Sequence, residues 1–277
     1  MSQSTVALCF DFDAVSTWLH TFKAHHSPTK HSRGVFGAEV GSRRILDVLD
    51  EADVPSTWFV PGHTADSFPD AVEAVLSDGH AIQSHGWSHT NPSEYESKAD
   101  ERADLKRSLA SLESLTGETP SGYRSPYWDF SRHTLELLQD LGFEWSSSLM
   151  GREFEPYYLR ENWSADPDEP YDPGERTDVL EFPVSWYRDD WPALQFVMGA
   201  SSQGPRPNEQ AFFEAWRAQF DWMHEHVDGG IFTLTMHPQI TGVAPRPEYL
   251  AELIDHMASK PDVTFRTLDS VAADIRS

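Results

Sequence analysis

The sequence is poor in cysteine and has no long hydrophobic run. Its only cysteine is Cys9, so an intramolecular disulfide is excluded. Cys9 lies within the apolar run "TVALCFDF" and is expected to be a core residue rather than a nucleophile. No apolar stretch approaches the roughly 20 residues of a membrane span. The N-terminal "MSQSTVALCF" lacks a basic region followed by a long apolar region, which predicts no secretory signal and a cytoplasmic location.

Basic residues are also scarce. The 277 residues include 21 Lys and Arg against 45 Asp and Glu, so the net charge is −24. The acids are spread along the whole chain, and such a surface stays hydrated but repels itself unless salt screens it. We therefore expect no binding to nucleic acid or to anionic membranes. The composition suggests adaptation to high salt, as in proteins of halophilic organisms; the alternative is an ordinary acidic cytosolic protein.

The chain does have enough apolar residues for a core, and its short strands alternate with helices. Apolar residues make up 39%, which argues against disorder. The alternation predicts an α/β fold with a parallel sheet or barrel, and a single domain over residues 1–277 is expected because no composition shift divides the chain. Residues 151–178, rich in Pro, Asp and aromatics, are expected to form a long ordered loop. Strands are expected at 5–12, 55–62, 80–85, 121–129, 144–150, 178–186, 229–238 and 263–268, and helices at 41–52, 67–79, 97–117, 131–143, 208–227 and 247–259.

Polar residues stand where several of these strands end, which is where parallel sheets and barrels carry functional groups. "CFDFDA" (9–14) puts Asp11 and Asp13 two residues apart at a strand end, so both point to one side. Two enclosed carboxylates cannot both ionise freely unless a cation intervenes. The pair therefore favours one carboxylate on a metal and the other handling protons, although taken alone it fits two solvated acids equally well.

"HGWSH" (85–89) places His85 and His89 four residues apart. If the second lies on a helical turn, both rings face one way and can share a metal. Two histidines with one carboxylate form a facial set that leaves positions open for water and substrate. Because the chain contains 13 histidines, the pair alone fits a structural or surface role as well.

Three further motifs carry groups suited to proton transfer or charge stabilisation. "YRSPYW" (123–128) sets Arg124 before a proline–tyrosine turn, where the guanidinium can orient a carboxylate and a backbone N–H can donate to an oxyanion. "SWYRDDWP" (185–192) combines an acid pair with tryptophans, and "FTLTMHP" (232–238) delivers His237 from the end of an apolar strand. A histidine with a carboxylate partner can stay protonated as a general acid. Each motif alone also fits a purely structural role.

Taken in order, these motifs resemble those of the polysaccharide deacetylase superfamily, the nodulation-type deacetylases. The family pattern is an aspartate pair, H-x-x-x-H, R-x-P-Y, an Asp-Trp element and L-x-x-H. The resemblance spans residues 5 to about 270. The corresponding stretches here are "FDFD" (10–13), "HGWSH" (85–89), "RSPY" (124–127), "DW" (190–191) and "LTMH" (234–237).

The resemblance implies a single-domain, distorted (β/α) barrel with fewer than eight strands. It also implies a divalent metal, usually zinc, on Asp13, His85 and His89. Asp11 would be the general base, with Arg124 orienting it.

The remaining roles follow from the same resemblance. Tyr127 would supply a backbone N–H to the oxyanion, and His237 would be the general acid. Asp190 would tune His237, with Trp191 packed beside it. The implied chemistry is hydrolysis of an amide C–N bond by an activated water.

Two departures from the family pattern stand out. Phe12 separates the aspartates, which are usually adjacent, and Tyr187 occupies the place of an acid that usually precedes the Asp-Trp element by three residues. The first departure is similar to the intracellular subgroup of peptidoglycan-deacetylase-like proteins, cyclic-imide hydrolases and metal-independent allantoinases, which are often homotetramers acting on small ligands. The second leaves the tuning of His237 open.

Four functions remain open, of which the weakest is a structural, acidic halophile protein whose histidines are incidental. The first is a metal-dependent hydrolase acting on a small N-acetyl sugar, cyclic imide or ureide. The second is a metal-independent, allantoinase-like hydrolase, disfavoured because Asp13, His85 and His89 are all present. The third is a non-catalytic binding protein on a deacetylase scaffold, disfavoured because Asp11 and His237 are retained.

Overall fold

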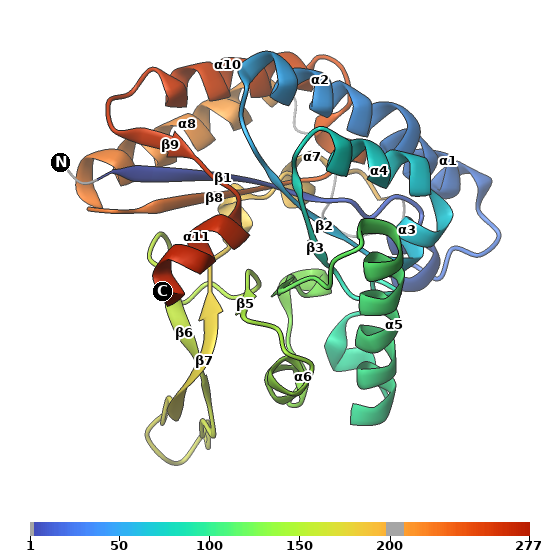
Figure 1. Cartoon of the computed structure of the whole chain (residues 1–277), viewed down its shortest axis with the longest axis vertical. Helices are drawn as coiled ribbons and strands as arrows, with labels where there is room; N and C mark the ends of the chain where they lie inside the picture. Colours follow the sequence, from blue (N-terminus) through green and yellow to red (C-terminus); the bar gives the residue numbers. More distant parts are fainter. Residues whose placement is uncertain (1–2, 198–207) are drawn as a thin grey trace.

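The computed structural model describes residues 3–197 and 208–277 and has an α/β fold in which helices cover a strongly curled sheet (Figure 1). Seven parallel strands form its continuous path in the order β7-β5-β4-β3-β2-β1-β8. These strands are β1 (Ser4–Asp11), β2 (Thr57–Val60), β3 (Ala81–Ser84), β4 (Gly122–Tyr123), β5 (Trp145–Ser146), β7 (Glu175–Glu181) and β8 (Ile231–Met236).

Two more strands raise the whole sheet to nine. β6 (Tyr157–Glu161) pairs antiparallel with β7, and β9 (Val263–Phe265) pairs with the start of β1. The predicted α/β fold and distorted barrel are confirmed. The seven-strand parallel path agrees with the expectation of fewer than eight barrel strands, but β6 and β9 take the sheet beyond that number. The single domain over residues 1–277 stays a prediction and includes residues outside the described ranges.

Each of the six expected helices is present. They are α2 (Ser42–Ala52), α4 (Pro69–Ser77), α5 (Lys98–Thr116), α6 (Thr134–Asp140), α8 (Glu209–His226) and α10 (Arg246–Ala258). Further, shorter helices were not expected from the sequence: α1 (Pro28–Phe36), α3 (Gly62–Ser67), α7 (Trp191–Leu194), α9 (Pro238–Thr241) and α11 (Leu268–Arg276). Within the described residues, no helix has the length and apolar character needed to cross a membrane.

The alternating side chains of β1 divide the core into two parts. Val6, Leu8 and Phe10 belong to the larger cluster, which includes buried residues of α2, α8 and α10. Ala7 and Cys9 face the barrel interior, and Cys9 is fully buried, as predicted for a core residue. Since side chains alternate along a strand, Asp11 follows Cys9 on the interior face and is delivered into the barrel at its carboxyl end.

The sheet is brought toward closure near the carboxyl ends of its strands. After β7 the chain crosses to β8, where Asp189 forms a parallel bridge with Thr235 and the Asp190 N–H donates to the Thr235 carbonyl at 3.3 Å. This crossing places the Asp189–Asp190 pair beside His237, which follows β8 directly. Acids and histidines from distant motifs therefore meet at one end of the barrel.

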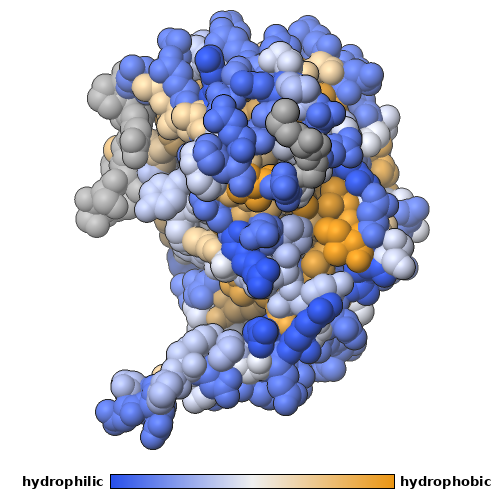
Figure 2. Space-filling model, turned by 90° about the vertical axis from the view of Figure 1, so that its left-hand side faces the viewer, coloured by the Kyte–Doolittle hydropathy of each residue, from blue (hydrophilic) through white to orange (hydrophobic). Residues whose placement is uncertain are grey.

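The prediction of a long loop at 151–178 was wrong, because most of this segment belongs to the hairpin that β6 and β7 form. Leu159 on β6 and Thr177 on β7 are buried, and the Thr177 hydroxyl donates to the Leu159 carbonyl at 2.9 Å. Residues 162–173 at its tip are all exposed. The hairpin projects at the bottom of Figure 1, and Figure 2 shows a mostly hydrophilic surface with a hydrophilic projection at its base.

Candidate active site

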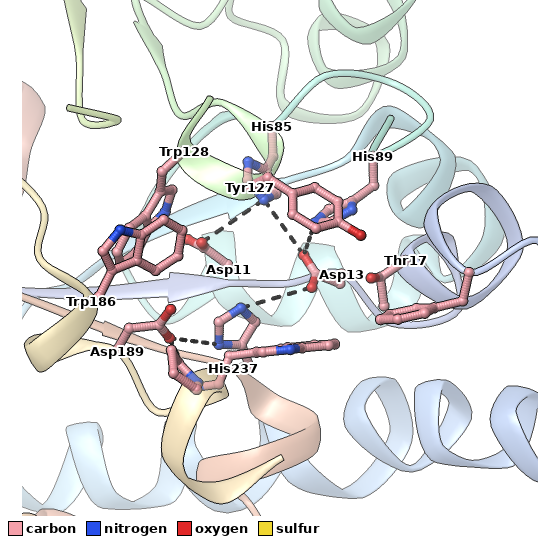
Figure 3. A pocket seen from close by; sticks show the side chains of 13 residues that line it. Asp11, Asp13, Thr17, His85, His89, Tyr127, Trp128, Trp186, Asp189 and His237 are labelled. Atoms are coloured by element: carbon pink, nitrogen blue, oxygen red, sulfur yellow. Dashed lines mark hydrogen bonds and ion pairs between the residues drawn. The ribbon is translucent and has the colours of Figure 1, made fainter. Parts of the chain in front are cut away.

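A pocket opens where β1, β3 and β8 end, and acids, histidines and aromatics line it together (Figure 3). Arg124 and Asp190 are fully buried behind its walls. The lining residues are Asp11, Asp13, Thr17, Phe22, His85, His89, Tyr127, Trp128, Trp186, Asp189, Trp191, Pro192 and His237.

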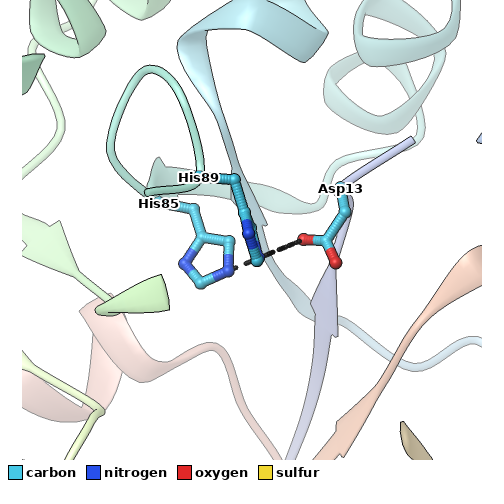
Figure 4. Close-up of side chains that lie close together, drawn as sticks. All are labelled: Asp13, His85 and His89. Carbon is cyan, nitrogen blue, oxygen red and sulfur yellow. Dashed lines mark ion pairs between the residues drawn. The ribbon is translucent and has the colours of Figure 1, made fainter. Parts of the chain in front are cut away.

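Asp13, His85 and His89 form a compact buried group (Figure 4). The Asp13 Oδ1 lies 3.3 Å from His89 Nε2 and 3.6 Å from His85 Nε2. For bond lengths of about 2.0–2.2 Å, ligand atoms around a tetrahedral zinc ion are roughly 3.4 Å apart. The three predicted ligands are therefore close enough to share one ion.

Hydrogen bonds on the far side of each imidazole fix which nitrogen faces the group. His85 Nδ1 lies 2.6 Å from the Arg124 carbonyl, which only accepts, so Nδ1 carries the proton. The Thr21 hydroxyl donates to the His89 carbonyl at 2.7 Å and so accepts from His89 Nδ1 at 2.9 Å. Both Nε2 atoms are thus left as lone-pair donors pointing toward Asp13. Metal-binding histidines usually have such a partner on the second nitrogen.

The charge state of the group also suits a cation. Burial favours a neutral Asp13, but His89, His237 and His85 outweigh it and lower the Asp13 pKa to about 2. Burial lowers the His85 pKa to about 4, so this ring is neutral at pH 7. Asp13 Oδ1 is buried and lacks a hydrogen-bond partner among the described residues. A buried carboxylate oxygen without a partner is costly, and a bound cation would satisfy it.

Asp11 lies beside this group and is oriented by Arg124. The Arg124 Nη1 donates to Asp11 Oδ1 at 2.8 Å, while Nε and Nη2 donate to the carbonyl and hydroxyl of Ser147, each at 2.8 Å. The guanidinium also lies over the Phe59 ring, 4.0 Å from its centroid. Asp11 Oδ2 is 3.8 Å from His85 Nε2. The second carboxylate is thus fixed next to the candidate metal ligands, where it can accept a proton.

His237 approaches from the opposite wall with Asp190 behind it. The His237 Nδ1 lies 2.6 Å from Asp190 Oδ1, and the Thr241 hydroxyl donates to Asp190 Oδ2 at 2.7 Å. Burial alone would lower the His237 pKa, but the Asp190 carboxylate dominates and raises it to about 10. The Trp191 ring packs edge-on against the imidazole, with centroids 5.1 Å apart. His237 is therefore protonated at neutral pH and can donate from Nε2.

Tyr127 stands at the pocket mouth on a strained turn. Its φ is +62° and that of Trp128 is +55°, a left-handed conformation that is costly for bulky residues and is often found at functional sites. Among the described residues, no backbone acceptor binds the Tyr127 N–H. That N–H is available to a ligand, as the predicted oxyanion role requires.

One residue of the pocket was visible in the sequence only as half of an acid pair, without a role of its own. Asp189 lines the pocket with Oδ1 3.7 Å from His237 Nδ1, and burial raises its pKa to about 8. Thr21 and Ser147 were not predicted, and they carry no motif that could have singled them out. Tyr187 is 80% exposed, so Asp189, and not Tyr187, is the second polar group beside the imidazole.

Gly86 and Trp87, which lie between the two histidines of the H-x-x-x-H motif, play different parts. Gly86 adopts φ +69°, which favours glycine. Trp87 is absent from the pocket lining. Its indole packs outward, with the Arg107 guanidinium 3.2 Å from the ring centroid.

Comparisons with known proteins agree with this geometry. A polysaccharide deacetylase family model matches residues 1–146. The chain is 35% identical to a peptidoglycan deacetylase of Helicobacter pylori over 97% of this chain and 95% of that protein. A Mycobacterium smegmatis structure described as a polysaccharide deacetylase matches with a TM-score of 0.86 and 33% identity, covering 99% of this chain and 91% of the other.

A more distant structure, PuuE allantoinase, matches with a TM-score of 0.78 and 20% identity over 98% of this chain and 90% of that one. At this identity it shows the shared fold alone. The family model, the full-length relative and the buried Asp-His-His group agree with one another. The chain belongs to the polysaccharide deacetylase family and is a hydrolase acting on carbon–nitrogen bonds other than peptide bonds.

Proposed function

We propose that this protein is a metal-dependent hydrolase that removes the acetyl group from a small N-acetylated amino sugar. The observation that carries the proposal is the position of the Asp13–His85–His89 group between two proton-transfer residues. Asp11 lies on one side, and His237 Nε2 lies 3.9 Å from Asp13 Oδ2 on the other. The carbonyl carbon and the nitrogen of an amide bound in this pocket would each lie near one of these two proton-transfer residues.

Asp13, His85 and His89 would hold a divalent ion, with zinc as the proposed metal. Such an ion polarises a carbonyl and lowers the pKa of a bound water. The lone pairs of the two Nε2 atoms and the Asp13 Oδ1, which lacks a hydrogen-bond partner, are suited to holding such an ion.

The protein's own groups account for the proton transfers. Asp11, fixed by Arg124, accepts a proton from the attacking water as the new C–O bond forms. The Tyr127 N–H donates to the oxyanion. His237 then protonates the leaving nitrogen as the C–N bond breaks, giving a carboxylate and an amine. Asp190 keeps that proton available by raising the His237 pKa to about 10.

Aromatic side chains around the pocket support a compact ring-shaped substrate. Trp128 and Trp186 pack against one another at a tilt of 30° with centroids 4.7 Å apart, while Phe22 and Trp191 lie nearly parallel with centroids 6.2 Å apart. Apolar ring faces suit the pocket for a sugar or a planar cyclic amide. The higher identity to the peptidoglycan deacetylase than to the allantoinase favours the sugar over a cyclic imide or ureide.

Two other functions account for fewer features of the site. A metal-independent, allantoinase-like hydrolase is suggested by the shared fold, but it would leave Asp13 Oδ1 without a partner. A non-catalytic binding protein would not need Asp11 and His237 to be oriented by Arg124 and Asp190.

The setting in which the protein works is proposed as well. We propose a cytoplasmic homo-oligomer, a tetramer by family resemblance, adapted to high salt and without nucleic-acid or membrane partners. The net charge of −24 supports both the adaptation to high salt and the lack of nucleic-acid or membrane partners.

The experiment that tests the function compares substrate classes with matched variants. Wild-type protein is incubated with N-acetylglucosamine, its short oligomers, cyclic imides and allantoin, and acetate release or ring opening is measured. We expect acetate release from the sugars, reduced about 10²–10⁴-fold in Asp11→Asn. Preferred ring opening of an imide or ureide would reassign the substrate. Turnover of none of them would support the binding protein instead.

A further inference from the structure

The loop between His85 and His89 is anchored by a carboxylate outside the pocket, Asp104 on α5. Asp104 Oδ2 accepts the Trp87 N–H at 2.7 Å. Its Oδ1 accepts the Ser88 N–H at 3.1 Å and the Ser88 hydroxyl at 2.6 Å. One side chain thus receives three hydrogen bonds from the two residues that directly precede His89.

The same loop is fixed from its other side by the start of α3. The Gly62 N–H donates to the Gly86 carbonyl and the His63 N–H to the Trp87 carbonyl, both at 2.9 Å. The start of α3 therefore binds the carbonyls of Gly86 and Trp87, while Asp104 binds the N–H groups of Trp87 and Ser88.

The loop needs such support because it ends in a residue with an uncommon backbone conformation. His89 has φ +53°, in the left-handed region that few residues other than glycine occupy, whereas Gly86 adopts its φ of +69° readily. Strained residues persist only where the surrounding structure determines them. A Cβ added at Gly86 would lie 3.1 Å from Asp104 Oδ2, so the loop and the carboxylate are also closely packed.

We propose that Asp104 is a positioning residue of the metal site, which aligns the His89 imidazole with His85 and Asp13 through the Trp87–Ser88 backbone. The inference rests on the proposed metal-dependent function. Asp104 is absent from the pocket lining, so it acts only through the loop. Outer residues that orient metal ligands typically change metal affinity by about 10–100-fold.

Asp104→Asn is a sharp test because it keeps the size of the side chain. If its remaining oxygen accepts from Ser88, its NH₂ group faces the Trp87 N–H, and two donors then oppose each other at a place where the native distance is 2.7 Å. Glu113→Gln is the matched control. It makes the same carboxylate-to-amide change on the same helix at an exposed position.

The measurement is the Kd for Zn²⁺ of metal-stripped protein by competition with a chromophoric chelator, together with the apo-protein melting temperature. We expect Asp104→Asn to raise Kd about 10–100-fold. Glu113→Gln should leave it unchanged. An unchanged Kd in Asp104→Asn overturns the inference, even if its melting temperature falls, because Asp104 would then serve stability alone.

Two further variants keep the outcomes separable. Ser88→Ala removes the hydroxyl bond to Asp104, together with the hydroxyl contacts to Thr90 and Tyr95, but keeps both backbone bonds to the carboxylate. It should therefore fold and weaken zinc binding less than Asp104→Asn. If Asp104→Asn does not fold, an unchanged Kd in Ser88→Ala overturns the inference. His89→Ala should abolish binding. If wild-type and His89→Ala bind zinc equally poorly, the metal site itself fails, and the role of Asp104 falls with it.

Discussion

The proton on His237 is controlled by two neighbouring acids with unequal contacts. Asp190 makes the 2.6 Å contact to Nδ1, while Asp189 lies 3.7 Å away and accepts the Trp191 N–H at 2.9 Å. Asp190 is therefore the principal cause of the raised His237 pKa of about 10. A general acid with such a pKa stays protonated well above pH 7, so its loss should appear only at alkaline pH.

Asp190→Asn should move the alkaline limb of the kcat/KM profile to lower pH by about one unit or more, because the opposite charge is lost. The pH dependence of the free energy of unfolding should also change in this variant. The raised pKa stabilises the folded state fully below about pH 6.5, and that contribution is lost as pH rises toward 10. The free energy of unfolding should therefore fall less between pH 7 and 10 in Asp190→Asn than in wild type. An alkaline limb that stays in place would contradict the assigned role of Asp190.

The site residues that stand in motifs could be predicted, including Arg124 and Asp190, which orient Asp11 and His237. The orienting residues that lie outside the motifs could not. Strand-end acids and histidines are visible because their chemistry is unusual beside apolar runs. Thr21 and Ser147, by contrast, are ordinary polar residues brought to His89 and Arg124 by folding. Asp104 likewise stands on a helix whose sequence shows only scattered charges. Their partners are far away in the sequence, so no local spacing reveals them.

Among the elements, strands of the barrel were easier to predict than the segments between them. Apolar runs such as β1 and β8 are buried along nearly their whole length, which gives a strong signal. In the β6–β7 hairpin only a few side chains are buried, and its polar tip hides the strand pattern. Short helices such as α7 and α9 have Pro in their first turn and too few residues for a period to show.

Shortening the hairpin tests whether its tip matters for the site. The tip is exposed, and Asn162 and Gly174 already have positive φ at its base. Replacing residues 163–173 by a short Asn-Gly turn should leave kcat/KM within about twofold, because loop tips tolerate such change. The melting temperature should also stay close to that of the wild type. A large loss of activity would mean that the tip reaches the substrate or a neighbouring copy of the chain.

At the scale of the whole molecule, the surface charge predicts a dependence on salt. A net charge of −24 on 277 residues repels itself, and the Debye length falls from about 10 Å at 0.1 M to about 3 Å at 1 M. The melting temperature should therefore rise between low and molar KCl. A melting temperature that does not respond to salt would contradict adaptation to high salt and favour an ordinary acidic protein.

The central claim is that Asp13, His85 and His89 bind the metal on which hydrolysis depends. It is tested most directly by metal analysis of purified wild-type, Asp13→Ala and His85→Ala proteins, with activity measured before and after chelation. The account predicts a single divalent ion per chain in the wild type, little in either variant, and activity that is lost on chelation and restored by zinc. Full metal content in both variants, or full activity in chelated wild-type protein, would contradict it.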